Sequence, residues 1–341
     1  MTSGGVMAAE MAEQPGILSR LIAQRDELFA RVRAILPPPP VRVVIVARGS
    51  SDHAAVYGRY VLEHAARTPV ALAAPSLRTR YRVDTGYNGY LAIAASQSGR
   101  TPEIVSTLEH MRSRGAVTLA VTNDADSPLA QAADLALGLG AGPERAIPAT
   151  KTFTAQLAMF ALLAEAIGPV PWAPSDWETV VPAVEAVLAD PAVAAPVAAE
   201  IGSARAAVVL ARGYFFSVAL EAALKLKETT SLLAWADSTA DFRHGPIAVV
   251  DSGLPVLALS AEGPCEADVA EIVRDIAARG GRVLSIADTP RADLPTAPGV
   301  PEALATIAAG VRAQQLALAL ARHRGLDADA PAGLSKITAT A

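Results

Sequence analysis

The sequence is poor in aromatic residues and in cysteine, and both shortages limit what the protein can be. Aromatic side chains make up 4% of the 341 residues and apolar residues 52%, so alanine and aliphatic side chains must fill the core. The single cysteine, Cys265, excludes an intramolecular disulfide framework and a cysteine-rich metal centre. One free thiol is typical of a reducing compartment, so we expect a cytoplasmic protein without a bound metal.

Positive charge is also in short supply. The formal net charge is −5, which leaves no broad basic surface for a nucleic-acid backbone. The N-terminal stretch MTSGGVMAAEMAEQPG lacks the basic and then apolar pattern of a signal peptide. The longest apolar runs, such as residues 157–164, are expected to be too short to cross a bilayer. We therefore expect neither a nucleic acid nor a membrane as a partner.

The chain repeats itself at a spacing of 164 to 165 residues. Three stretches find a second copy in the same order along the chain, which makes chance a poor explanation. Gly49 and Gly213 follow similar aliphatic runs, and Ser96 aligns with Ser260 at the same spacing. The matched stretches are 43–49 (VVIVARG) with 208–213 (VVLARG), 91–99 with 254–263, and 114–123 with 279–288. The chain thus holds two copies of one fold.

Each copy alternates short apolar runs with longer helical patterns. Runs that are apolar throughout are typical of parallel strands covered on both faces, and their alternation with helices predicts a doubly wound α/β sheet. We expect a helical N-terminal arm over 1–40, a first α/β domain over 41–170, and a second domain with a C-terminal tail over 171–341. The Pro-rich stretch 168–174 marks the boundary between the two copies.

Hydroxyl-rich loops follow two expected strands of the first copy, and ligands of doubly wound sheets bind at such strand ends. Thr101 and Pro102 form a good N-cap and first helical residue, so a helix should begin there. A glycine-containing loop that leads into a helix offers N–H groups and a favourable dipole to an anion. Hydroxyls can merely cap helices and turns, but two such loops on neighbouring strands favour phosphate binding. The predicted phosphate-binding residues are Gly49, Ser50, Ser51, Ser96, Gln97, Ser98 and Thr101.

The second copy lacks the two hydroxyl-rich loops. Its equivalent loop, 260–263 (SAEG), carries the Glu262 carboxylate, which would repel a phosphate. Gly213 is followed by aromatic residues instead of hydroxyls. One phosphate site per chain is therefore expected, in the first copy.

The second copy carries candidates for acid–base chemistry. Glu221, Lys225 and Glu228 are spaced by four and three residues and so share one helix face. Such charges are usually a solvated ion pair, but a carboxylate held beside a lysine in a buried contact can move a proton. His244 precedes Gly-Pro and should lie in a loop, where it could reach a ligand or simply face solvent. Lys336, taken alone, is a solvated tail residue.

Taken together, these residues resemble a known family. The motifs are GSSDHA at 49–54, SQSGRT at 96–101, ATKTFTAQ at 149–156, ALEAALKLKE at 219–228, HGP at 244–246 and the C-terminal lysine. Over nearly its whole length, the chain resembles the isomerase half of glucosamine-6-phosphate synthase (glutamine–fructose-6-phosphate aminotransferase) and the related SIS-type glucosamine-6-phosphate deaminases. The resemblance implies two tandem sugar-isomerase (SIS) domains.

The resemblance also implies roles for single residues. Glu228 matches the base that moves a proton between C1 and C2 of a sugar phosphate, and Lys225 lies beside it. His244 matches the group that opens the sugar ring; in the family it comes from the neighbouring subunit, so a homodimer with a shared active site is expected. Lys336 matches the tail lysine that approaches the carbonyl end of the substrate. The hydroxyl loops match the family's phosphate positions, and Ala149 and Ser335 fall in its sugar site. No metal or redox cofactor is implied.

The expected reaction is an isomerising deamination, in which glucosamine 6-phosphate and water give fructose 6-phosphate and ammonia. The chain shows no N-terminal glutaminase domain with a cysteine nucleophile, so it is not expected to take ammonia from glutamine. The stretch 237–244 looks like the deaminase pattern, although Asp241 is shorter than the usual glutamate. Pro148 and Ala149 alter the loop that lines the family's sugar site, which leaves the exact sugar open.

Other functions remain open at this point. The alternatives are galactosamine-6-phosphate isomerisation, deglycation of a fructosamine 6-phosphate, an isomerase-only homologue of the aminotransferase, and a non-catalytic regulatory protein that senses sugar phosphates. Glu228, His244 and Lys336 argue against the sensor, because a sensor would need only the phosphate loops.

Overall fold

The structure is a computed structural model that describes residues 4–336. It forms two compact units, each built around one parallel five-stranded sheet. The first-sheet unit contains Gly16–Glu144 and Lys151–Pro171. The second-sheet unit contains the chain up to Pro15, Arg145–Thr150 and Trp172–Lys336. The helical segment that precedes the first strand is therefore divided between the two units.

The first sheet has the strand order β2-β1-β3-β4-β5, with all neighbours parallel. Its strands are β1 (Arg42–Val46), β2 (Val70–Leu72), β3 (Tyr90–Ser96), β4 (Val117–Thr122) and β5 (Leu135–Gly138). The central strands are buried along nearly their whole length, which explains their continuous apolar runs. The predicted parallel sheet is confirmed.

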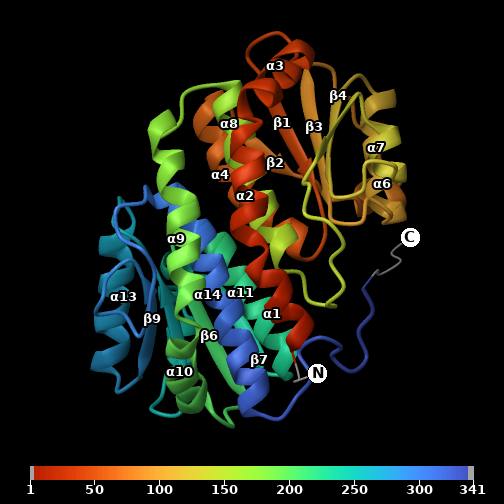
Figure 1. The fold of residues 1–341 in the computed structure, drawn as a ribbon. Helices are drawn as coiled ribbons and strands as arrows, with labels where there is room; N and C mark the ends of the chain where they lie inside the picture. The colour runs from red at the N-terminus through yellow and green to blue at the C-terminus, as the bar shows by residue number, and fades with distance from the viewer. Residues whose placement is uncertain (1–3, 337–341) are drawn as a thin grey trace. The chain divides into compact units, whose positions relative to one another are not determined.

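Helices cover both faces of the first sheet (Figure 1). On one face, α6 (Pro102–Ser113) and α7 (Pro128–Ala132) place Ile104, Leu108 and Leu129 against side chains of β1, β3 and β4. On the other, α4 (Ser50–Ala66) packs against α8 (Lys151–Ile167), which in turn contacts α3 (Arg25–Ile35). The remaining helices of this part are α2 (Gln14–Ala23) and the short α5 (Ser76–Thr79). The expected doubly wound arrangement is thus present.

The second sheet has the order β7-β6-β8-β9-β10, again all parallel. Its strands are β6 (Ala206–Ala211), β7 (Leu233–Ser238), β8 (Val256–Leu259), β9 (Val283–Ala287) and β10 (Leu294–Pro295). Numbered within each copy, the two sheets share the order 2-1-3-4-5. This identity of topology confirms that the chain is an internal duplication.

The second sheet is also covered on both faces (Figure 1). On one face lie α11 (Phe215–Thr230) and α14 (Glu302–His323), with α9 (Trp177–Ala189) and α10 (Ala194–Ile201) packed on α14. On the other face lie α12 (Thr239–Arg243) and α13 (Glu266–Ala278), whose Phe242, Ile272 and Ile276 contact β6 and β8. The other elements are α1 (Gly5–Ala12) and the 3-10 helices η1 (Pro174–Asp176), η2 (Pro191–Val193) and η3 (Pro246–Val249).

One helix corrects an expectation drawn from the sequence. By length and composition, α14 could cross a membrane, and the helices over Pro174–Ala189 and Pro191–Ile201, bent by 60°, could do so as a pair. No apolar stretch of that length was expected. However, 94% of the most apolar window of α14 is buried, which is typical of a core helix.

Candidate active site

The loops predicted to bind phosphate follow two hydrogen-bonded strands of the first sheet. β1 and β3 are neighbours with Val46 opposite Ala94, while β2 lies on the other side of β1. In the order 2-1-3-4-5, the gap outside the carboxyl ends of β1 and β3 is the topological switch point, where such sheets bind ligands. The two hydroxyl-rich loops therefore begin at the expected binding position of the fold.

Each of these loops leads into a helix. Gly49 precedes α4 with φ 60°, a left-handed conformation that an L side chain would strain. Pro102 is the first residue of α6, as predicted, and Thr101 is its N-cap. The Thr101 side chain makes no capping hydrogen bond, although an N-cap threonine usually does. This observation weighs against a purely structural role for the Thr101 hydroxyl.

The serine hydroxyls are oriented by hydrogen bonds that they accept. Ser96 Oγ accepts from Gly99 N–H at 3.2 Å, and Ser98 Oγ accepts from Arg100 N–H at 3.3 Å. Ser51 Oγ accepts from Gln156 Nε2 at 2.9 Å. A hydroxyl that accepts in this way still has its own proton to donate. Accepting from the protein and donating to a phosphate oxygen are thus compatible.

The 97–99 loop is fixed from behind by the ends of neighbouring elements. The Gln97 carbonyl accepts from Asn123 N–H at 3.1 Å, and the Gly99 carbonyl accepts from Leu129 N–H at 3.1 Å. Gly99 has φ 62°, and a Cβ at this position would lie 2.2 Å from Ser127 Oγ. Glycine is therefore required here by both conformation and space, and the loop is held in one shape.

The arginines that flank these loops are both paired with carboxylates. Arg48 contacts Glu103, which is 9% exposed, at 3.0 Å. Arg100 contacts Asp124 at 2.8 Å, and its hydrogen bond holds the pKa of Asp124 below the usual value. Because both arginines are paired with carboxylates, the remaining hydrogen-bond donors in these loops are mainly hydroxyl and backbone N–H groups. The arrangement supports capture of a phosphate by uncharged donors.

The equivalent position in the second sheet holds a carboxylate of the protein itself. Glu302, at the first position of α14, is 9% exposed, and burial raises its pKa. A Cβ on Gly263 would lie 2.7 Å from Glu302 Oε2, so the carboxylate packs directly on the loop that follows β8. Cys265 lies on the same side, with its Sγ 2.8 Å from a Cβ placed on Gly213. Because the Glu302 carboxylate occupies this position, a phosphate is not expected to bind there, in agreement with the prediction of one phosphate site per chain.

The ion group on α11 is buried. Lys225 Nζ lies 3.3 Å from Glu221 Oε1 and makes a short hydrogen bond to Glu228 Oε2. The side chains of Lys225 and Glu221 are 1% and 3% exposed, and that of Glu228 is 20% exposed. Burial alone would lower the pKa of Lys225, but the two carboxylates outweigh it and the net effect is to raise that pKa. The interpretation as a solvated ion pair is therefore wrong.

The geometry suits Lys225, Glu221 and Glu228 to different roles. Lys225 stays protonated, so it is a fixed cation and not a base. Glu221 lies fully inside, whereas Glu228 holds the solvent-facing end of the group. A carboxylate that lies beside a buried ammonium and is open on one side can accept and return a proton.

His244 is exposed and follows α12, in a loop as predicted. Its backbone N–H donates to the Asp241 carbonyl at 2.9 Å, and Gly245 has φ 133°, which only glycine adopts readily. Asp241 is bound in the cap of α12: its carboxylate accepts from Ser238 Oγ at 2.6 Å, and Ser238 Oγ accepts from Asp241 N–H at 3.2 Å. Asp241 therefore shapes the turn that presents the histidine.

Lys336 is not a free tail residue. Its Nζ donates to the Ala146 carbonyl at 2.7 Å, so the lysine is held against Arg145–Thr150, the segment that also carries Ala149. Ser335, next to it, is exposed. Within the second-sheet unit, the structure thus joins the tail lysine to the predicted sugar-site segment.

Two buried polar residues near these groups were not predicted as site residues. Gln156, which is 1% exposed on α8, orients Ser51. Glu10, which is 4% exposed on α1, accepts from Arg145 N–H and Ala146 N–H. Gln156 stands in the ATKTFTAQ motif and could have been noticed there. Nothing in the sequence near Glu10 points to residues more than a hundred positions away.

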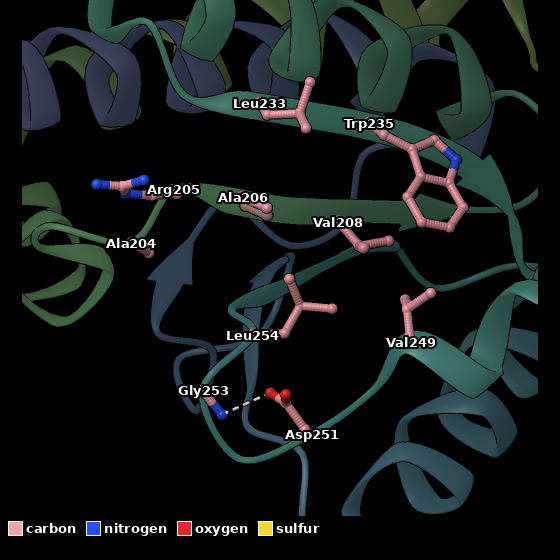
Figure 2. A pocket seen from close by; sticks show the side chains of 11 residues that line it. Ala204, Arg205, Ala206, Val208, Leu233, Trp235, Val249, Asp251, Gly253 and Leu254 are labelled. Carbon is pink, nitrogen blue, oxygen red and sulfur yellow. Dashed lines mark hydrogen bonds between the residues drawn. The ribbon is translucent and has the colours of Figure 1, made fainter.

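A cavity of about 560 Å³ in the second-sheet unit contains none of the predicted site residues. It lies at the amino ends of β6 and β7, and its walls include Val208, Leu233 and Trp235 (Figure 2). Asp251 and Arg205 are the charged residues at its edge, and Asp251 accepts from Gly253 N–H at 2.8 Å. Because Asp251 is engaged in its own turn and none of the predicted acid–base residues lines this cavity, we do not assign the active site to it. Within residues 4–336, no group of three or more His, Cys, Asp or Glu side chains could hold a metal ion.

Two parallel sheets of the same strand order define a duplicated doubly wound α/β protein, with a candidate anion site at the switch point of the first sheet. The family model described as "SIS domain" matches residues 39–166 and 200–321, and the chain belongs to this family. The chain is 34% identical to the isomerizing glutamine–fructose-6-phosphate aminotransferase of Zymomonas mobilis, over 97% of this chain and 58% of the relative. The enzyme of the same name from Thermus thermophilus gives the same identity and coverage.

The chain spans 58% of the length of these curated relatives and is homologous to their isomerase half. Among solved structures, a proposed phosphosugar isomerase of Silicibacter pomeroyi is 34% identical, with a TM-score of 0.79 over 95% of this chain and 99% of that one. The glucosamine-6-phosphate deaminase of Thermotoga maritima is 24% identical, with a TM-score of 0.79 over 98% of this chain and 100% of that one, and so shows the shared fold alone. The expected resemblance to SIS phosphosugar isomerases is confirmed.

Proposed function

We propose that this protein is an enzyme that converts an amino-sugar 6-phosphate by aldose–ketose isomerisation with release of ammonia. The preferred substrate is glucosamine 6-phosphate, and the products are fructose 6-phosphate and ammonia. The observation that carries the proposal is the buried Lys225 that holds the Glu228 carboxylate at the open end of an ion group. A protein that only senses sugar phosphates has no need of a carboxylate paired with a buried lysine, because burying the charged groups costs desolvation free energy.

The proposed reaction begins with the phosphate held at the switch point of the first sheet. The hydroxyls of Ser51, Ser96, Ser98 and Thr101, together with backbone N–H groups, bind it without a charged side chain. Because the phosphate fixes one end of the open-chain sugar, the carbonyl end is held at a constant distance from it. His244 assists opening of the sugar ring.

Glu228 then removes the proton from C2 of the open-chain amino aldose and returns it to C1. Together with the transfer of one proton from the amine nitrogen to the C1 oxygen, this step converts the C1 aldehyde and C2 amine into a C1 alcohol and a C2 imine. Water adds to the imine and ammonia leaves, which gives the C2 ketone. Lys225 holds the Glu228 carboxylate in place, and Lys336 acts near the carbonyl end of the sugar. The chain's own residues thus supply each proton transfer.

The decisive experiment combines an ammonia assay with isotope exchange. Purified protein is incubated with glucosamine, galactosamine and fructosamine 6-phosphates in deuterated water, and ammonia and C2 deuterium are both measured. Ammonia and exchange with glucosamine 6-phosphate, without glutamine, support the proposal. Exchange without ammonia would reassign the protein as an isomerase. Binding of sugar phosphate with neither signal would identify a sensor.

The role of Glu228 is tested by a matched pair of variants. Glu228→Gln keeps the shape but removes the proton acceptor, so turnover should fall by about 10²–10⁴-fold while substrate still binds. Glu221→Gln makes the same chemical change on the inner carboxylate and leaves the Lys225–Glu228 contact in place, so its loss should be much smaller. Equal losses in the two variants would show that Glu228 is not the base.

We also propose that the enzyme is a cytoplasmic homodimer whose active site takes His244 from the partner subunit. The exposed position of His244 supports this, since no part of the second-sheet unit covers it. Complementation between inactive variants, described below, tests the proposal directly.

A further inference from the structure

The position of Lys336 depends on a buried carboxylate at the other end of the chain. Lys336 Nζ donates to the Ala146 carbonyl at 2.7 Å. The N–H groups of Arg145 and Ala146 donate to the Glu10 carboxylate, the second at 3.3 Å. Both polar groups of the Ala146 backbone are therefore engaged, one by Glu10 and the other by Lys336. The three partners are far apart in sequence and meet only in the folded second-sheet unit.

Glu10 is buried, and burying a carboxylate is unfavourable unless hydrogen bonds compensate for its lost hydration. It is 4% exposed, and the apolar side chains of Met7, Met11 and Leu318 surround this part of α1. A carboxylate at such a place requires compensating hydrogen bonds, and two successive backbone N–H groups provide charge-assisted ones. An apolar residue could fill the space without this desolvation penalty, but it could not bind the N–H groups of Arg145 and Ala146.

Asp329 connects the same segment to the start of α1, through its backbone carbonyl on one side and its carboxylate on the other. Asp329 accepts from Val6 N–H at 3.0 Å and Met7 N–H at 2.7 Å, which satisfies the first turn of α1. The backbone carbonyl of Asp329 accepts from Ile147 N–H at 3.0 Å. Three consecutive N–H groups, at 145, 146 and 147, are thus all bound. The Ala146 carbonyl and the Ile147 N–H belong to one planar peptide group, so the bond to Asp329 orients the carbonyl that accepts from Lys336.

We propose that Glu10 is a positioning residue for Lys336. Its carboxylate fixes residues 145–147 so that the Ala146 carbonyl holds the Lys336 ammonium beside the segment that carries Ala149. Lys336 and the segment Arg145–Thr150 then form one rigid group. The Lys336 ammonium is therefore already in position when the carbonyl end of the substrate binds. The catalytic consequence rests on the proposed function; the structural consequence, a sequestered Lys336, does not.

The test uses Glu10→Gln, Lys336→Ala and the double variant in the full chain. Glutamine keeps the shape of Glu10 but turns an amide toward one of the two N–H donors, so one hydrogen bond is lost. Glu13→Gln is the matched control, because Glu13 is exposed and lies three residues further on. Rates of ammonia release and of tryptic cleavage after Lys336, followed by mass spectrometry, are measured for each variant, with the unfolding midpoint.

Glu10→Gln should lower kcat at least about tenfold and leave KM within about twofold, because the phosphate contacts are unchanged. It should add no further loss to Lys336→Ala, since the two residues act through one group. Tryptic cleavage after Lys336 should be roughly tenfold faster than in the wild type and in Glu13→Gln. Independent, additive losses of activity, or unchanged protection of Lys336, would overturn the proposal.

The positioning role can still be tested if Glu10→Gln does not fold or if the proposed function is wrong. If Glu10→Gln does not fold, Asp329→Asn is used instead: it weakens the hydrogen bonds to Val6 and Met7 N–H, which hold the start of α1 and so place Glu10. This variant should also lower kcat with little change in KM, and Lys336 should lose its protection from trypsin. If the wild type releases no ammonia from any amino-sugar phosphate, the proposed function fails. The cleavage rates then still support or reject the positioning role.

Discussion

Replacing Lys225 by methionine removes the cation from between Glu221 and Glu228 and keeps a side chain of similar length. In the wild type the ammonium lies 3.3 Å from Glu221 Oε1 and closer still to Glu228 Oε2, with the lysine only 1% exposed. The substitution leaves two carboxylates in a buried space without a counter-charge. Breaking a buried ion group in this way typically costs about 3–5 kcal/mol of unfolding free energy.

The assay follows urea unfolding by tryptophan fluorescence. The three tryptophans, Trp172, Trp177 and Trp235, all belong to the second-sheet unit, so the signal reports the unit that contains α11. With a slope of about 3 kcal/mol per molar urea, the midpoint should fall by roughly 1–2 M. The exposed Lys227 on the same helix gives the matched control: Lys227→Met should stay within about 0.5 kcal/mol of the wild type.

The pH dependence follows from the raised pKa of Lys225. Burial opposes the charge of this lysine and the two carboxylates favour it, with a net rise above the ordinary value of 10.5. A raised lysine pKa contributes stability that is complete below pH 10.5 and is lost as the pH rises through the folded-state pKa. The stability gap between the wild type and Lys225→Met should therefore stay constant from neutral pH to about pH 10 and narrow above it.

A double variant decides whether the cause is the unpaired charge. Glu221→Gln/Lys225→Met leaves only Glu228, whose side chain is 20% exposed and can be partly solvated. At least half of the lost stability should return. If Lys225→Met is as stable as the wild type, or if the double variant is no more stable than Lys225→Met, the ion group does not stabilise the fold as argued.

Three further predictions follow from the other groups. Ser98→Asp should raise KM for sugar phosphate at least about tenfold, because a carboxylate would face the phosphate at the switch point; an unchanged KM would remove this loop from the site. Cys265 has a pKa raised to about 11 by burial and by the Glu302 and Asp268 carboxylates, so alkylation at pH 8 should be roughly two hundredfold slower than for a free thiol, and a rate within tenfold would contradict this. Glu228→Gln and His244→Ala subunits, each inactive alone, should regain activity when refolded together, since one site per heterodimer is then intact. If mock-treated wild type recovers but the mixture does not, the shared site is rejected.

Several features of the fold follow from the sequence because their causes are local. Continuous apolar runs such as 43–46 have no polar face and therefore become buried parallel strands. Pro102 cannot continue a strand ladder and is well suited to the first helical position, so α6 begins where the pattern predicts. The repeat between Gly49 and Gly213 also depended only on comparison of the chain with itself, and the shared strand order confirms it.

The candidate site is predictable to the extent that its residues come in motifs. The hydroxyl loops after β1 and β3 were recognised from composition and from the strand-end rule, and the spacing of Glu221, Lys225 and Glu228 placed them on one helix face. The sequence could not show that this face is buried, because charged helix faces usually meet solvent. Only the packing of α11 turns an ordinary ion pair into a lysine with a raised pKa.

What only the tertiary structure decided are contacts between distant parts of the chain. Glu302 of α14 fills, in the second copy, the strand-end position that hydroxyls occupy in the first copy. Glu10 reaches the backbone of residues 145–146, and that backbone holds Lys336. Periodicity and turn chemistry determine which elements form, because they act over a few residues. Which side chains meet across more than a hundred residues is determined by how the elements pack, and one sequence carries no local signal of that.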